Sequence, residues 1–177
     1  MGIRTVRTEG DECLRKVCKP VKSVSLRTRI LIEDMFDTRY ESGGVGLAAP
    51  QIGVLKRIVV MDTDDNQHVL INPQILEVSG EQTGYEGCLS IPGKSGIVTR
   101  PDYVKVKALN ERGEEYVLEG EGLLARCICH ECDHLDGILY SDKAEGGLIN
   151  NEDLPEDEEE ELYEDAYEEF TEEEIHK

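Results

Sequence analysis

Basic and aromatic residues are scarce in this chain. Its 177 residues include no Trp and two Phe, and 19 Lys and Arg stand against 39 Asp and Glu, for a formal net charge of −20. So acidic a surface argues against binding nucleic acid through phosphate contacts. No uncharged apolar run is long enough to cross a bilayer, and the N-terminus lacks a signal-peptide core. We therefore predict one cytoplasmic domain that does not engage a membrane.

The predicted cytoplasmic location also bears on the state of the six cysteines. In a reducing cytoplasm, cysteines stay free or bind metal and rarely form disulfides. Cys129 and Cys132 are spaced Cys-x-x-Cys, which is typical of redox and zinc pairs. One pair on one helix turn, with no second pair, makes a poor zinc site. Most of the six are therefore predicted to be small buried side chains.

The segment 130–134, His-Glu-Cys-Asp-His, is the most informative part of the sequence. On a helix, His130 and His134 would lie on one face, one turn apart, where two imidazoles can bind one metal ion. Glu131 between them could act on a metal-bound water. Apolar residues recur at helical spacing before the motif, and Asp136-Gly137 is typical of a helix end. The pattern predicts a hydrolytic metal site on a buried helix.

A hydrolytic metal site needs a third protein ligand and leaves one position open to water. One class of zinc peptidase has a further histidine where this chain has Tyr140, so that ligand is missing. Cys88, within Glu-Gly-Cys-Leu-Ser at 86–90, could supply a thiolate. A glutamate of the acidic C-terminus is the alternative, and spacing alone leaves both open.

A third segment, residues 44–51, has the sequence Gly-Val-Gly-Leu-Ala-Ala-Pro-Gln. Its glycines would allow a ligand to approach the backbone closely. The Gln51 amide could donate a hydrogen bond to an oxyanion that develops during a reaction. The alternative is a buried turn whose glycines serve only the backbone. No Lys-Ser or Lys-Thr follows the glycines, so nucleotide binding is not predicted.

Taken together and in this order, the three segments resemble the peptide deformylase family. That family is identified by Gly-x-Gly-Leu-Ala-Ala-x-Gln, Glu-Gly-Cys-Leu-Ser and His-Glu-x-Asp-His, all of which this sequence contains. The resemblance covers about residues 1–145. It implies an α+β fold with antiparallel β-sheets around a central metal-binding helix. It also implies an activity, removal of the formyl group from the N-terminal formyl-methionine of newly synthesised polypeptides.

The resemblance further implies a mechanism. Cys88, His130 and His134 would hold one divalent ion, with ferrous iron as the native metal and zinc, nickel or cobalt as substitutes. A water would be the fourth ligand, and Glu131 would take its proton and later pass it to the leaving amine. The ligand set alone does not choose the metal, because one thiolate and two imidazoles suit zinc equally well.

Substrate contacts are implied in the same way. The Gln51 amide and the backbone N–H of Leu89 would hold the oxyanion. The peptide would bind as an added strand beside Val45 and Gly46. The other candidates for substrate contacts are Glu86, Gly87, Leu124 and Cys127, of which the last two would line the methionine pocket.

The rest of the scaffold follows from hydrophobic periodicity. Leu26, Ile30, Leu31 and Met35 are helically spaced and predict a surface helix over 26–40. Alternating or β-branched segments flanking polar turns predict two hairpins. Their strands are expected at 57–62 and 69–71, and at 103–108 and 115–118.

Negative charge is concentrated at the C-terminus. Residues 151–177 hold 15 Asp and Glu and one Lys, which is −14 of the total charge of −20. We therefore divide the chain into a catalytic domain, 1–150, and an acidic tail, 151–177. Leu162, Ala166 and Phe170 are spaced by four, so the tail is predicted to be partly helical. RNA would repel a tail of this sign, so it is not expected to bind nucleic acid directly.

Three functions are compatible with the sequence. A deformylase would act on the formyl-methionyl nascent peptide, with the ribosome as a further candidate partner. A zinc endopeptidase of the His-Glu-x-x-His type would take a tail glutamate as its third ligand. A catalytically silent relative would use the metal only to hold its fold. Every catalytic position of the family is present, which favours the first.

Overall fold

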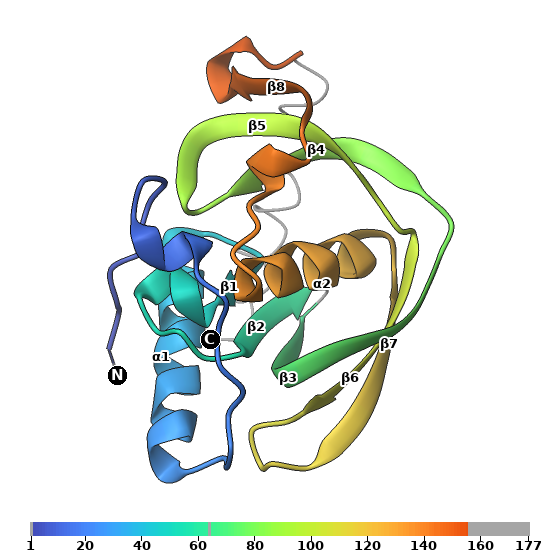
Figure 1. Ribbon diagram of the computed structural model, residues 1–177. Coiled ribbons are helices and arrows are strands. Elements are labelled where there is room, and N and C mark those ends of the chain that lie inside the picture. Colours follow the sequence, from blue (N-terminus) through green and yellow to red (C-terminus); the bar gives the residue numbers. More distant parts are fainter. Residues whose placement is uncertain (1, 64, 156–177) are drawn as a thin grey trace.

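The computed structural model describes residues 2–63 and 65–155, which form two helices and two antiparallel sheets (Figure 1). A five-stranded sheet has the order β1-β2-β3-β6-β7, and a three-stranded sheet has the order β4-β5-β8. The α+β class predicted from the sequence is confirmed. The elements are α1 (Leu26–Ser42), α2 (Gly122–Leu135), β1 (Gly46–Ala48), β2 (Ile58–Thr63), β3 (Asn66–Ser79), β4 (Gln82–Cys88), β5 (Ile91–Arg100), β6 (Tyr103–Leu109), β7 (Glu115–Glu121) and β8 (Glu145–Asn150).

The first helix, α1, matches the prediction in position but not in its buried face. Leu31 and Met35 are buried as expected, whereas Leu26 is 74% exposed and Ile30 is 46% exposed. The helix contacts β1 and β2, and Ile32 joins the buried face in place of the two exposed residues. Helical spacing identified the helix, but which of its faces is buried depends on where the sheet lies.

Both predicted hairpins are present. Val60 of β2 lies opposite Val69 of β3, and Val106 of β6 lies opposite Leu118 of β7. The strand β3 has 14 residues, far more than the three predicted, and its second half pairs with β6. That half is exposed, so no alternation of apolar and polar residues marks it as a strand.

The second helix, α2, crosses the centre of the molecule and contacts strands of both sheets (Figure 1). Ala125, Ile128 and Leu135 are fully buried. The helix ends before Gly137, which has a φ of +74° and whose Cβ, if present, would lie 2.5 Å from the Arg15 carbonyl oxygen. Only glycine fits there, so the predicted helix end is confirmed. Neither helix of the described residues is long and apolar enough to span a membrane.

The hairpin β4–β5 was not predicted from the sequence. Cys88 pairs with Ile91 across a turn of two residues, Leu89 and Ser90. Its strands contain glycines at 84, 87, 93 and 96, which weaken any strand signal. The third strand, β8, adds to β5, and a short 3-10 turn, η4 (Asn151–Asp153), follows it. The predicted tail helix around 162–170 lies outside the described residues.

Candidate active site

Three side chains of types that bind metals meet in the centre of the molecule, although they come from separate parts of the sequence. They form a candidate metal-binding cluster, called the metal cluster below. Cys88 ends β4, and His130 and His134 lie one turn apart on α2. One candidate ligand atom from each of the three lies within 4.8 Å of the others, and Cys88 Sγ is 3.4 Å from His134 Nε2. Two imidazoles and one sulfur at this spacing fit a tetrahedral divalent ion with one position left open.

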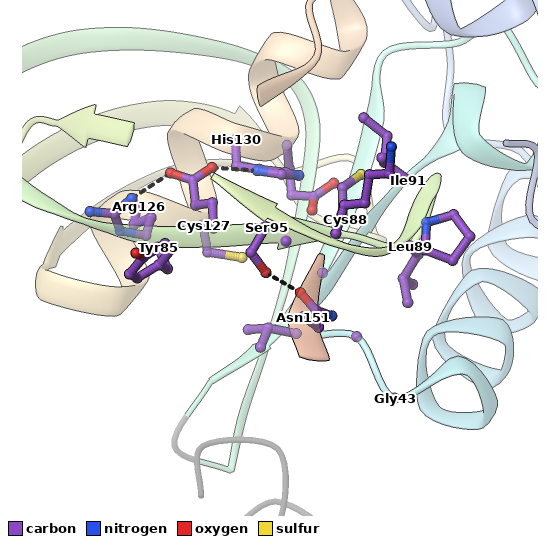
Figure 2. A pocket seen from close by; sticks show the side chains of 18 of the residues that line it. Gly43, Tyr85, Cys88, Leu89, Ile91, Ser95, Arg126, Cys127, His130 and Asn151 are labelled. Carbon is purple, nitrogen blue, oxygen red and sulfur yellow. Dashed lines mark hydrogen bonds and ion pairs between the residues drawn. The ribbon is translucent and has the colours of Figure 1, made fainter. Parts of the chain in front are cut away.

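The ring orientation of His130 is fixed by a carboxylate behind it. His130 Nδ1 lies 2.7 Å from Glu86 Oε1, which leaves Nε2 for a metal (Figure 2). Arg100 donates to both oxygens of Glu86, at 2.9 and 3.0 Å, and Arg126 donates to Oε2. Burial opposes the charge of Glu86, but hydrogen bonds from His130 and Arg100 hold its pKa well below the usual value. Glu86 is therefore an ionised carboxylate that orients a ligand.

The network continues to the fourth residue of the motif. Arg100 Nη1 donates to Asp133 Oδ2 at 2.6 Å, and Lys143 Nζ lies 3.0 Å from the same oxygen. Arg100 is 3% exposed, so this ion pair is shielded from water. Asp133 thus ties α2 to β5 through Arg100, while its neighbour His134 faces the metal cluster.

The two imidazoles have different electrostatic environments. Burial lowers the pKa of His134 well below its ordinary value, and the nearby His130 lowers it further. For His130, burial would also lower the pKa, but hydrogen bonds with Cys88 and Glu86 raise it well above the ordinary value. A neutral imidazole binds metal, so His134 is already in the form that a metal needs. Its Nδ1 has no hydrogen-bond partner among the described residues.

Glu131 is the side chain best placed to move a proton. It is 4% exposed, lines the cavity described below, and its Oε2 has no hydrogen-bond partner among the described residues. Burial raises its pKa to about 7. A Cβ at Gly46 would lie 3.1 Å from Glu131 Oε1 and 3.0 Å from Cys127 Sγ. Gly46 therefore leaves the space in front of this carboxylate open.

Gln51 lies on the other side of the cysteine ligand. It belongs to the 3-10 turn η2 (Ala49–Ile52), is 1% exposed, and accepts the Ala48 N–H on Oε1 at 2.9 Å. That bond directs Nε2 toward Cys88 Sγ at 3.6 Å and Ser90 Oγ at 3.1 Å. The segment is thus a short strand and a turn that aim one amide donor at the metal cluster.

A cavity of about 430 Å³ opens beside these residues (Figure 2). Among the predicted substrate contacts, Leu124 does not line it, because its side chain packs against Gly120 and the core. Leu123 of the same helix lines the cavity instead. The predicted site residues that do line it are Val45, Gly46, Gln51, Glu86, Gly87, Cys88, Leu89, Cys127, His130 and Glu131.

Sequence reasoning missed several residues of the cavity wall. Leu123 and Arg126 lie four residues before Cys127 and His130, so their helical spacing could have identified them. Asn151 and Leu154 also line the cavity, although they follow the predicted boundary of the catalytic domain. No sequence signal places these two residues there, because their position depends on the pairing of β8 with β5.

The chain matches the family model described as polypeptide deformylase over residues 3–147. It is 60% identical to the peptide deformylase of Agathobacter rectalis over 148 residues, which are 84% of this chain and 94% of that protein. It is 54% identical to the peptide deformylase of Lachnoclostridium phytofermentans over 163 residues, 90% of this chain and all of that protein.

Solved structures give the same result. The peptide deformylase of Thermotoga maritima superposes with a TM-score of 0.80 at 41% identity, covering 82% of this chain and 99% of that one. That of Synechococcus elongatus, crystallised in complex with actinonin, superposes with a TM-score of 0.79 at 41% identity, covering 81% of both chains.

Proposed function

The chain belongs to the polypeptide deformylase family, whose members act on N-formyl peptides, and we propose that it removes the formyl group from the N-terminal formyl-methionine of newly synthesised polypeptides. The observation that carries the proposal is the cluster of Cys88, His130 and His134 beside Glu131 and one long cavity. We place this reaction in the cytoplasm, where such polypeptides are made.

Cys88, His130 and His134 would hold a divalent ion. When bound, the ion would lower the pKa of a coordinated water and polarise the formyl oxygen. We propose ferrous iron as the native metal, and the donor set of one sulfur and two nitrogens also suits zinc, nickel or cobalt. The Glu86 carboxylate would keep the His130 ring in its ligating orientation.

Glu131 would act as both general base and general acid. Its carboxylate would take a proton from the attacking water and return it to the amine that leaves. A pKa of about 7, raised by burial, allows both steps near neutral pH. Its unpartnered Oε2 is free to accept that proton, because no described residue competes for it.

Two donors would stabilise negative charge on the formyl oxygen. Gln51 Nε2 already lies 3.6 Å from Cys88 Sγ, so an oxygen beside the cluster would come within its reach. Leu89 follows the cysteine directly and lines the same cavity, and its backbone N–H would be the second donor. Losing one donor of this kind typically slows turnover by about 10²–10³-fold.

The substrate backbone would bind as an additional strand. β1 is the first strand of the five-stranded sheet and pairs only with β2 there, so its other edge faces the cavity at Val45 and Gly46. A free strand edge offers backbone donors and acceptors to an extended peptide. Leu123 and Cys127 would contact the methionine side chain, since both are apolar and line the cavity.

One assay separates the proposal from its alternatives. Purified protein with measured metal content is incubated with a formyl-Met-Ala-Ser peptide and, separately, with an unformylated peptide that offers only internal bonds. We expect formate release from the first and no cleavage of the second. Internal cleavage would favour a zinc endopeptidase, and stoichiometric metal without either reaction would favour a catalytically silent relative. Ribosome binding is a separate proposal that this assay does not require.

A further inference from the structure

The chain returns to the cavity after its last strand. β8 ends at Asn150, the turn η4 covers Asn151–Asp153, and both Asn151 and Leu154 line the same cavity as the metal cluster. The family match ends at residue 147, so these two residues lie beyond the segment that the family model describes. We call Asn151 and Leu154 the C-terminal wall.

Asn151 is held in a defined orientation. Its Oδ1 accepts a hydrogen bond from Ser95 Oγ at 2.6 Å, which Figure 2 shows. Ser95 is 1% exposed and lies on β5, where its backbone pairs with Ile149 of β8. Because Oδ1 faces Ser95, the Asn151 amide nitrogen lies on the other side of the group. Among the described residues that nitrogen has no hydrogen-bond partner, so it offers two donors at the cavity wall.

Leu154 provides an apolar surface next to that donor. Leu154 is 6% exposed, although it lies in an irregular segment that follows a short turn. A leucine so buried is fixed by packing, because removing its side chain from water stabilises the segment. The wall therefore combines a side-chain amide donor, from Asn151, with a buried apolar contact, from Leu154.

The proposed reaction already accounts for the other residues that line the cavity. In that reaction the metal cluster, Glu131 and Gln51 would surround the formyl group, and Leu123 and Cys127 on α2 would contact the methionine side chain. A volume of about 430 Å³ suits a ligand larger than one amino acid. The C-terminal wall belongs to the β5–β8 side of this space, because Asn151 directly follows β8 and bonds to Ser95 of β5.

We propose that Asn151 and Leu154 determine specificity for the residues that follow formyl-methionine in the substrate, an inference that rests on the proposed deformylase function. The Asn151 amide donates to a backbone carbonyl of the peptide, as amide side chains do when they fix an extended chain. Leu154 contacts an apolar side chain beyond the methionine. Neither residue takes part in the chemistry, so their effect falls on substrate binding.

The test compares two substrates of different length. If the wall contacts residues beyond the methionine as proposed, formyl-Met-Ala would be too short to reach it and formyl-Met-Ala-Leu-Leu would extend along it. In Asn151→Asp, the acceptor for Ser95 remains and the two donors are lost; Leu154→Ala removes the apolar contact. For both variants we expect KM for the longer peptide to rise about three- to tenfold, the scale of one lost hydrogen bond or truncated apolar contact, with kcat unchanged. KM for the shorter peptide should not change.

Asn150→Ala is the matched control. Asn150 precedes the wall, does not line the cavity, and its amide donates to Asp153 instead. It should leave both substrates unaffected. Metal content is measured for every variant, because loss of metal would show a structural role and overturn the proposal. An equal rise in KM on both peptides, or no rise on either, would also overturn it. Failure of the unmodified protein to deformylate even the short peptide would instead refute the proposed function.

Discussion

The two sides of the cavity are built in different ways. On one side, which we call the core side, Gln51 and Glu131 are at most 4% exposed and are positioned by elements of the core. On the other, Asn151 rests on Ser95 through one hydrogen bond, and Leu154 is the anchor. The first side has the groups whose geometry the reaction needs, so the core fixes them. The second is attached to the edge of the small sheet, where the contacts to a substrate can change without disturbing the proposed chemistry.

The largest effect is expected on the core side. Replacing Cys88 by Ala should abolish tight metal binding and activity together, because two imidazoles alone do not complete a three-ligand site. The measurement is metal content by elemental analysis together with formate release. Cys13→Ala is the control, since Cys13 contacts the Pro50 carbonyl outside the ligand cluster and should retain both. A Cys88→Ala protein with full metal content and turnover would exclude Cys88 as a ligand and favour a glutamate of the tail as the third metal ligand.

Removing the proposed general base should have the next largest effect. Glu131→Gln preserves size and burial but cannot accept a proton, so kcat should fall by at least about 10²-fold while the metal stays bound. The decisive readout is kcat at equal metal content. Normal turnover in the metal-loaded variant would mean that another group transfers the proton.

The sequence predicted the core side better than the C-terminal wall. Cys88, His130 and Glu131 belong to contiguous motifs, so they could be identified before any fold was known. The exposed Leu26 shows the limit of periodicity, which identifies a helix but not which of its faces is buried. Asn151 could not be identified, because it reaches the cavity through strand pairing between residues about fifty positions apart in the sequence.

Truncation tests whether the first side of the cavity works without the second. Truncation after Asn150 removes the C-terminal wall and the acidic tail, while every proposed catalytic residue stays. Turnover of a short formyl-Met peptide should remain within a few-fold of the full chain, since the core side is intact. Steady-state kinetics on that peptide test this expectation. Abolished turnover in a folded, metal-containing protein would show that the proposed chemistry depends on the C-terminal segment.

The same truncation tests the role of the tail in ribosome binding. The tail carries 13 Asp and Glu between residues 156 and 177, and charges of this sign are repelled by RNA phosphates within about one Debye length, ~8 Å at physiological salt. We expect sedimentation with ribosomes to be no weaker without it. A salt-sensitive loss of binding after truncation would identify the tail as a docking element.

The smallest effect is expected far from both sides. Asp34, on α1, accepts hydrogen bonds from the Arg4 side chain and the Gly2 N–H, and the Arg4 contact holds its pKa below the usual value. A carboxylate with a lowered pKa stabilises the fold above its unfolded-state pKa and loses that effect as pH falls. Asp34→Asn should therefore lower the free energy of unfolding by about 1 kcal/mol at pH 7. Urea unfolding at pH 7 and pH 3 should show the two proteins converging in acid, without a change in kcat.

Gly46, Cys127 and Glu131 constrain one another's evolution. A Cβ at position 46 would lie 3.0 Å from Cys127 Sγ and from Glu131 Cγ, and 3.1 Å from Glu131 Oε1. A smaller residue at 127 would relieve only the first of these contacts, and the glutamate is required for the proposed chemistry. Position 46 is therefore fixed for as long as Glu131 is kept, whereas position 127 can change alone and alter the pocket proposed for methionine.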